Sequence, residues 1–498
     1  MKRILIIIGI LLSLLDARAF DVRAVYVDHR TQVMTMPALK AFAKKAADGG
    51  MNAIIMEWEA SFPFRENATL CNQYAFSVEE VKDFVAYCSS IGIDVIPLQN
   101  CFGHAEYILR HERYAVLRED NRDFSQVCPL KVQQAEPVFR SIFAEIAALH
   151  PSKYLHIGCD ETVLLGRDKK CAAYIEENGR SKLFVGYVAR MCAIAKELGK
   201  TPVIWADILL QYPEAAAELP EDVVIVDWNY GWKANHFGDL DALIAQGFTM
   251  WGASSMRSSP DNIYLTDWPK HFANLRNYVP FCREKGFAGM VQTSWSTSGT
   301  YGYVRDHGNT IDIQPIREVY PVSAFDVLLQ AFFEALATEA PLADDFVRRY
   351  AAGHFGFGED GCSLLEDFFA MEQKPVTGRG VKQEDLSAAI SEVEAMGKRL
   401  HSARPRKARS EFKHYVLMMD IRLNYLKYRK VQLCFEAPGF GCEGRPALAA
   451  ELKPLIREAK KLDRRFRRLN ASTLKDPSVQ LGKYSYVQQM KYLYATCR

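Results

Sequence analysis

Short apolar runs alternate with longer amphipathic segments along the first two thirds of the chain. The runs are rich in Val, Ile and Leu and many are apolar throughout, which is typical of parallel strands that are covered on both faces. They predict eight strands, at residues 22–28, 52–58, 93–98, 154–159, 203–206, 223–226, 248–251 and 288–292. Eight β-then-α units in succession favour an α/β fold of the (β/α)8 TIM barrel type over an open, doubly wound sheet.

The segments between these runs have helical spacing, most clearly at residues 36–48, 77–90 and 136–149. Ser77, with Glu80 three residues later, has the pattern of a capping box. Gly49 and Gly50 stand where glycines commonly end a helix. These signals support the alternation of strands and helices that a barrel requires.

The sequence becomes charged, helical in period and poor in strands from about residue 340 onward. Apolar residues recur at helical spacing through 386–400, and residues 412–435 and 447–469 continue with long helical patterns. We therefore predict a (β/α)8 barrel at residues 20–340 and an α-helical C-terminal domain at residues 341–498, packed on or beside the barrel.

The first 19 residues have the pattern of a cleaved signal peptide. Lys2 and Arg3 precede the apolar segment 4–15, and Ala17-Arg18-Ala19 supplies small residues for cleavage. An apolar core of about 12 residues is shorter than the ~20 that cross a bilayer. We expect an exported protein, periplasmic or secreted, without stable membrane insertion.

The 498 residues carry a formal net charge of only +2, which gives no reason to expect a nucleic-acid partner. The 12 cysteines are scattered, and no pair of CxxC spacings indicates a structural zinc site. No HExxH spacing is present either, so we expect no metal and no other cofactor. Oligomeric state and disulfide pairing stay open at this level.

Polar residues stand at the carboxyl ends of the predicted strands, where a barrel enzyme holds its active site. Asp160 and Glu161 follow the fourth run, and Glu57 and Asp207 occupy corresponding places. Because neighbouring side chains of a strand point to opposite faces, Asp160 and Glu161 can serve one ligand only if the chain leaves strand geometry there. Gly158, just before them, lets a ligand or another backbone segment approach the chain closely. Two carboxylates in an apolar site indicate glycoside hydrolysis, although such a dipeptide alone is weak evidence.

Six of the seven tryptophans lie at or just beyond strand ends: Trp58, Trp205, Trp228, Trp232, Trp251 and Trp295. A single Trp there more often fills the core of an α/β protein. As a group at the active end of a barrel, they favour a pocket for the apolar faces of a sugar. His104, after the third strand, is either a structural histidine or a partner that helps to set the protonation of a catalytic carboxylate.

Several separated segments resemble glycoside hydrolase family 20, the β-N-acetylhexosaminidases. The run from His156 to Glu161 is similar to the family's H-x-G-x-D-E motif. Residues 97–106, 57–59 with 62–64, and 251–254 resemble the hexosaminidase D branch. The similarity extends over about residues 21–335.

The resemblance implies an exo-acting, retaining enzyme that removes terminal β-linked GalNAc or GlcNAc from a glycan or glycoconjugate. In this family the substrate's own 2-acetamido oxygen attacks the anomeric carbon, so the intermediate is an oxazolinium. By the same resemblance Glu161 is the general acid and base, and Asp160 orients the acetamido group. The substrate-binding residues expected from strand ends and resemblance together are Arg23, Glu57, His104, Trp205, Asp207, Trp228, Trp251, Trp295, Tyr301 and Tyr303.

Two departures from the family pattern leave alternatives open. Trp295-Ser296-Thr297 lacks the glutamate of the family's Trp-x-Glu, which leaves the choice between gluco and galacto epimers undecided. The tyrosine for the acetamido carbonyl is Tyr301 or Tyr303, with Tyr264 behind them. A catalytically inactive barrel that binds acetamido sugars, and a retaining glycosidase of another type, are the rival functions.

Overall fold

The computed structural model describes residues 20–498, apart from 259–260, 262–263, 297–300, 307–309, 316–318, 373, 375, 377–379 and 477–485. The side chains of 301–306 and 310–315 also lie outside the described part. The predicted signal peptide therefore falls outside it. None of the helices in the described ranges is long and apolar enough to cross a membrane.

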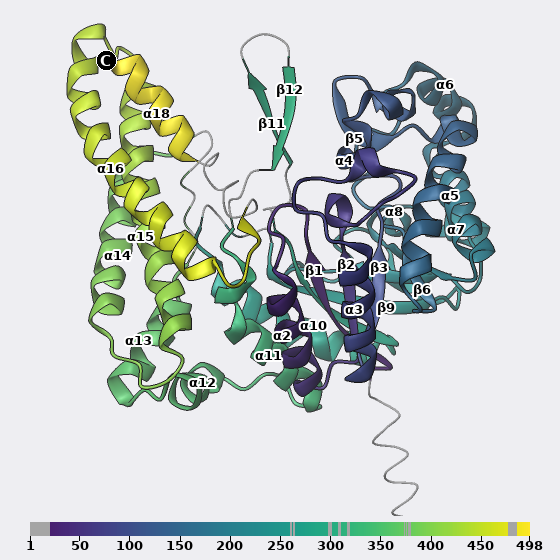
Figure 1. Ribbon diagram of the computed structural model, residues 1–498, viewed down its shortest axis with the longest axis horizontal. Coiled ribbons are helices and arrows are strands. Elements are labelled where there is room, and N and C mark those ends of the chain that lie inside the picture. Colours follow the sequence, from purple (N-terminus) through teal and green to yellow (C-terminus); the bar gives the residue numbers. More distant parts are fainter. Residues whose placement is uncertain are drawn as a thin grey trace, which may run out of the picture.

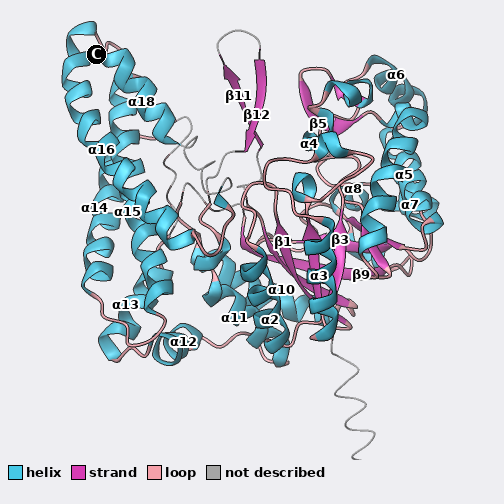
Figure 2. Cartoon of the chain, in the orientation of Figure 1, coloured by secondary structure: helices cyan, strands magenta, loops and turns pink. Residues whose placement is uncertain are grey.

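Eight parallel strands close into a barrel, as the sequence predicts (Figures 1 and 2). The first strand pairs with the last, where Val22 aligns with Gly289. The barrel strands are β1 (Val22–Asp28), β2 (Ala53–Glu57), β3 (Asp94–Leu98), β6 (Tyr154–His156), β7 (Thr201–Trp205), β8 (Val224–Trp228), β9 (Thr249–Arg257) and β10 (Gly289–Ser294).

Helices lie between the strands and cover the outside of the barrel (Figure 1). Ser77 and Glu80 do form the predicted capping box at the start of the second of them. These helices are α2 (Met36–Asp48), α3 (Val78–Ser90), α4 (Glu106–Leu109), α5 (Val132–Leu149), α6 (Lys169–Asn178), α7 (Arg180–Glu197), α8 (Asp207–Gln211), α9 (Leu240–Ile244), α10 (Trp268–Glu284) and α11 (Asp326–Ala337).

Two antiparallel hairpins that we did not predict project from the barrel. One is formed by β4 (Arg118–Asp120) and β5 (Asp123–Val127), and the other by β11 (Tyr301–Asp306) and β12 (Thr310–Pro315). Their strands are short or polar, so they lack the apolar runs by which the barrel strands are found in the sequence.

The C-terminal region is helical and packs beside the barrel (Figure 1). Trp268 of α10 is fully buried and its ring contacts those of Phe368, Phe369 and Tyr415. Burial of such large aromatic surfaces joins the two parts in one continuous core. The helices are α12 (Phe346–Phe355), α13 (Glu359–Phe369), α14 (Gln383–Ser402), α15 (Arg409–Phe435), α16 (Arg445–Asn470) and α18 (Tyr486–Cys497).

Two barrel strands differ in length from the prediction, and both differences affect the site. Strand β6 ends at His156, three residues earlier than expected. Strand β9 continues to Arg257, six residues beyond Trp251. Apolar content alone does not mark where a strand stops, because buried loop residues at the end of a barrel can be equally apolar.

Candidate active site

A cavity of about 300 Å³ lies at the carboxyl ends of the strands, where Trp205 ends β7 and Trp228 ends β8. Pockets for small molecules span roughly 300–1,000 Å³, so this one suits a compact ligand. We call it the barrel pocket. Its lining consists of Arg30, His104, Asp160, Glu161, Trp205, Trp228, Tyr230, Trp232, His236, Phe237, Ser258 and Trp295.

The two adjacent carboxylates reach the same pocket because the backbone turns sharply after β6. Gly158, Cys159 and Glu161 have φ angles of 74°, 78° and 47°, all in the left-handed region. A non-glycine residue there is uncommon, and such conformations occur where a site needs them. A Cβ atom on Gly158 would lie 2.1 Å from the Asn100 side-chain oxygen, so this position also requires glycine for close packing.

His104 lies between the two carboxylates. Its Nε2 is 3.3 Å from Oδ2 of Asp160 and 3.2 Å from Oε2 of Glu161. Burial by itself lowers the pKa of His104, but the negative charge of Asp160 and hydrogen bonds to both carboxylates raise it well above its usual value. Burial by itself raises the pKa of Asp160, and the charge and hydrogen bond of His104 more than offset this, so that pKa is lowered. Both pKa shifts favour an ionised Asp160 beside a protonated His104.

Asp160 and Glu161 differ in surroundings. The side chain of Asp160 is 10% exposed and that of Glu161 is 45% exposed. Oδ1 of Asp160 is buried and has no hydrogen-bond partner among the described residues. Buried polar atoms are normally satisfied, so this oxygen is an acceptor available to a ligand. Glu161 is the carboxyl group that is open to the pocket.

Asp207 supports the pair from outside the pocket lining. Its Oδ2 accepts the backbone N–H of Glu161 at 3.0 Å, and its Oδ1 accepts the indole N–H of Trp228 at 3.4 Å. Burial, together with the charge of Asp160, raises the pKa of Asp207 to about 8. Asp207 therefore positions Glu161 and Trp228, and it lies behind the pocket wall.

Arg30 is the arginine of the pocket wall, and we did not predict it. Its Nε and Nη2 donate to Oδ2 of Asp28 at 3.0 and 2.9 Å, and its guanidinium lies 5.1 Å from the centroid of the Trp295 ring. Glu57 lies next to it, 3.4 Å from Nε, and accepts hydrogen bonds from Tyr26 and Asn100. Burial raises the pKa of Glu57 to about 7. The predicted Glu57 is thus a buried partner of this network, and Arg30 is the group that reaches the pocket.

Aromatic rings form the rest of the wall. The ring centroids of Trp205 and Trp295 are 5.9 Å apart, and those of Trp228 and Phe237 are 4.2 Å apart. The indole N–H of Trp295 donates to the hydroxyl of Tyr230 at 2.9 Å. The predicted Trp205, Trp228 and Trp295 are therefore brought together, and they offer faces on which a sugar ring can stack.

Two predicted residues lie elsewhere. Arg23 is near the amino end of β1, where its side chain donates to the carbonyl oxygens of Phe20 and Gly50. Trp251 is the third residue of the nine-residue strand β9, and its ring packs on Tyr154 inside the barrel. Both predictions are corrected for the same reason: a residue near the start of a strand lies at the end of the barrel opposite the pocket.

The structure describes the side chains of only some of the tyrosines that we predicted for the site. Tyr301 and Tyr303 belong to β11, and their side chains lie outside the described residues. Tyr264 is buried against Tyr486. Tyr230, which we overlooked, lines the pocket; it lies two residues beyond the end of β8, and Arg30 lies two residues beyond the end of β1. Searching the first few residues after each predicted strand would have found both.

A (β/α)8 barrel that presents paired carboxylates and a wall of aromatic rings at its strand ends defines a glycoside hydrolase. The chain belongs to glycosyl hydrolase family 20. Residues 29–277, half of the chain, match the model of the family's catalytic domain. The family resemblance seen in the sequence is confirmed.

Known relatives agree with this assignment. Hexosaminidase D of Bos taurus is 28% identical over 266 residues, which cover 49% of this chain and 76% of that protein. Hexosaminidase D of Homo sapiens is 28% identical over 305 residues, which cover 57% of this chain and 61% of that protein. The solved structure of Flavobacterium johnsoniae chitobiase is similar in fold, with a TM-score of 0.52 at 15% identity over 96% of this chain and 71% of that one.

Proposed function

We propose that this chain is an exo-acting, retaining β-N-acetylhexosaminidase that removes terminal β-linked GalNAc or GlcNAc from a glycan by substrate-assisted catalysis. The observation that carries the proposal is the division of labour between Asp160 and Glu161. Asp160 is buried, its pKa is lowered by His104, and it has an acceptor oxygen without a partner among the described residues. Glu161 shares the same pocket and is the more exposed of the two.

In the first step, the acetamido carbonyl oxygen of the bound sugar attacks its own anomeric carbon. The bond to the leaving oxygen breaks, and Glu161 gives its proton to that oxygen as general acid. Asp160 accepts a hydrogen bond from the acetamido N–H, which orients the group and stabilises the positive charge that develops on it. The product is a cyclic oxazolinium held in the pocket.

In the second step, the ionised Glu161 removes a proton from water as the water attacks the anomeric carbon. The carbon–oxygen bond of the oxazolinium ring breaks, which restores the acetamido group and the protonated Glu161. Two inversions at one carbon give net retention of the β configuration. The backbone bond from Glu161 to Asp207 holds the acid and base in place through both steps.

Hydrolysis of aryl β-N-acetylhexosaminides by matched variants tests the proposal. Loss of a general acid reduces turnover by about 10²- to 10⁴-fold. We expect that reduction for Glu161→Gln on a substrate with a poor leaving group and a much smaller one with dinitrophenolate, which departs without a proton. Asp160→Asn should reduce turnover with both leaving groups, because it impairs the nucleophile. Glu177→Gln, at an exposed position of α6, should be unchanged.

Three results would contradict the proposal. Normal turnover of Glu161→Gln and Asp160→Asn would remove both residues from catalysis. Equal turnover of an aryl glucoside that lacks the acetamido group would show a mechanism without substrate assistance. Binding of acetamido sugars without any turnover would favour the rival hypothesis of an inactive sugar-binding barrel. Parallel assays on GalNAc, GlcNAc and sulfated GlcNAc substrates would assign the epimer.

A further inference from the structure

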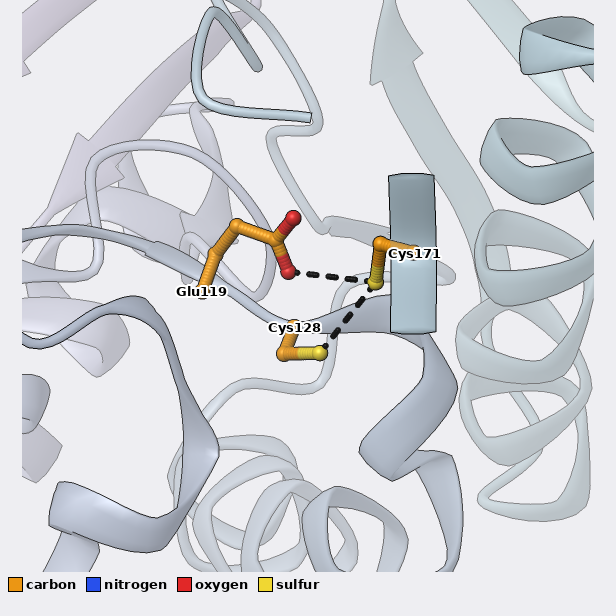
Figure 3. A group of neighbouring side chains, drawn as sticks. All are labelled: Glu119, Cys128 and Cys171. Atoms are coloured by element: carbon orange, nitrogen blue, oxygen red, sulfur yellow. Dashed lines mark hydrogen bonds between the residues drawn. The ribbon is translucent and has the colours of Figure 1, made fainter. Parts of the chain in front are cut away.

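Two cysteines and a glutamate meet in a buried cluster away from the barrel pocket (Figure 3). The sulfur atoms of Cys128 and Cys171 are 3.4 Å apart, and Sγ of Cys171 is 3.3 Å from Oε2 of Glu119. All three side chains are buried, and one ligand atom from each lies within 4.8 Å of the others. We call these residues the thiol cluster.

The thiol cluster joins three separate segments. Glu119 belongs to β4, Cys128 follows β5, and Cys171 lies in the first turn of α6. Oε1 of Glu119 accepts backbone N–H groups of Gly166 and Asp168 at 2.9 and 3.1 Å. That carboxylate oxygen is therefore satisfied, whereas Oε2 is directed toward the thiols. Two backbone hydrogen bonds fix the orientation of Glu119, as outer partners do for metal ligands.

The distances from the Cys171 sulfur to the other two atoms suit a tetrahedral zinc ion. Zn–S bonds of about 2.3 Å and Zn–O bonds of about 2.0 Å, at tetrahedral angles, separate two sulfurs by about 3.8 Å and a sulfur from an oxygen by about 3.5 Å. The observed 3.4 and 3.3 Å are within a few tenths of an ångström of these values. Thiolates also select zinc over the hard cations magnesium and calcium.

Two other groups of neighbouring side chains resemble the thiol cluster, but each lacks one of its features. Cys101 and Cys159 are also buried with sulfurs 3.8 Å apart, but both sulfurs are directed to the backbone carbonyl oxygen of Ile157 and not to a carboxylate. Asp326 lies near His354 and Glu411, and the Lys45 ammonium bonds it directly. In the described part of the chain no Lys or Arg side chain bonds Glu119, so no side-chain ammonium or guanidinium competes with a metal ion for Oε2 of this buried carboxylate.

We propose that the thiol cluster binds one Zn²⁺ through the sulfurs of Cys128 and Cys171 and Oε2 of Glu119. Binding releases the two thiol protons to solvent, and no oxidation is involved. Because Glu119 also holds Gly166 and Asp168, the ion secures the loop that follows Glu161. The three side chains leave the fourth tetrahedral position to a water molecule, and occupancy of the site does not depend on the proposed glycosidase chemistry.

Metal content of the purified full-length chain tests this proposal. After incubation with Zn²⁺ and removal of the excess, we expect about one equivalent per chain by elemental analysis. Cys128→Ser and Cys171→Ser should lose it, whereas Cys192→Ser, which changes a fully buried cysteine of α7, should keep it. Glu161→Gln should also keep it, which separates failure of this proposal from failure of the proposed function.

A second measurement does not depend on the folding of any variant. Replacement of zinc by Co²⁺ in the unaltered chain should produce thiolate-to-cobalt charge-transfer absorption in the near ultraviolet. Absence of that absorption together with less than a tenth of an equivalent of zinc would overturn the proposal. So would recovery of Cys128 and Cys171 as a disulfide from chain purified without an oxidant, or full zinc retention by both serine variants.

Discussion

Gly158→Ala is the sharpest test of how the site is built. Gly158 has a φ angle of 74°, and an added Cβ would lie 2.1 Å from Oδ1 of Asn100. The carboxamide of Asn100 donates to Oε1 of Glu57 at 2.7 Å, so it cannot move away without losing that bond. Gly199 offers a matched control, because its φ angle is 73° and nothing lies within 4 Å of an added Cβ.

Both substitutions lower the free energy of unfolding through backbone strain, and only Gly158→Ala also loses a hydrogen bond. A left-handed backbone costs a non-glycine residue about 1–2 kcal/mol. Loss of the hydrogen bond to the Glu57 carboxyl adds about 1.5–3 kcal/mol for Gly158→Ala only. At roughly 2.1 cal/mol/K per residue, about 450 described residues give an unfolding entropy of about 1 kcal/mol/K. We therefore expect Tm to fall by about 3–5 °C for Gly158→Ala and about 1–2 °C for Gly199→Ala.

Thermal unfolding and steady-state kinetics on both variants complete the experiment. Displacement of the turn moves Asp160, and a misplacement of about 1 Å can reduce turnover by about 10²-fold. Gly199→Ala, at the end of α7, should keep normal turnover. Equal Tm values for the two variants, with full activity of Gly158→Ala, would refute the close packing of Gly158 on Asn100.

Three further predictions follow from the pocket and the chain terminus. Arg30→Lys should lower kcat/KM at least about tenfold because the guanidinium that donates twice to Asp28 and lies over the Trp295 ring is lost, whereas Arg23→Lys should leave it unchanged. Equal effects of the two variants would contradict a specific role of Arg30 in the pocket. The raised pKa of Asp207, about 8, means that the folded state holds a proton that the unfolded state has released, so stability falls as pH rises from ~4 toward 8. The urea midpoint of Asp207→Asn should therefore decline less with pH than that of the unaltered chain over this range. A steeper decline would contradict the raised pKa of Asp207. Exported protein should begin at Phe20 by N-terminal sequencing, and retention of Met1 would argue against the signal peptide.

The sequence determines much of the barrel because its signals are local. Apolar runs and helical spacing identify all eight strands, and the capping box begins α3 where expected. The sequence also predicts Asp160 and Glu161 as site residues, since they follow such a run directly, and both line the barrel pocket. Each of these inferences depends on a few consecutive residues and on the rule that barrel sites lie at the carboxyl ends of strands.

Features that depend on contacts between distant segments were decided only by the tertiary structure. The left-handed turn that brings Asp160 and Glu161 to one pocket depends on the packing of Gly158 against Asn100, 58 positions earlier in the chain. The arginine that reaches the pocket is Arg30, two residues beyond the end of β1, because the length of a strand sets which residue emerges at its carboxyl end. The thiol cluster unites residues from three segments with no recognisable spacing. Periodicity reports which face of an element is buried, but contacts between distant segments form only when the whole barrel closes.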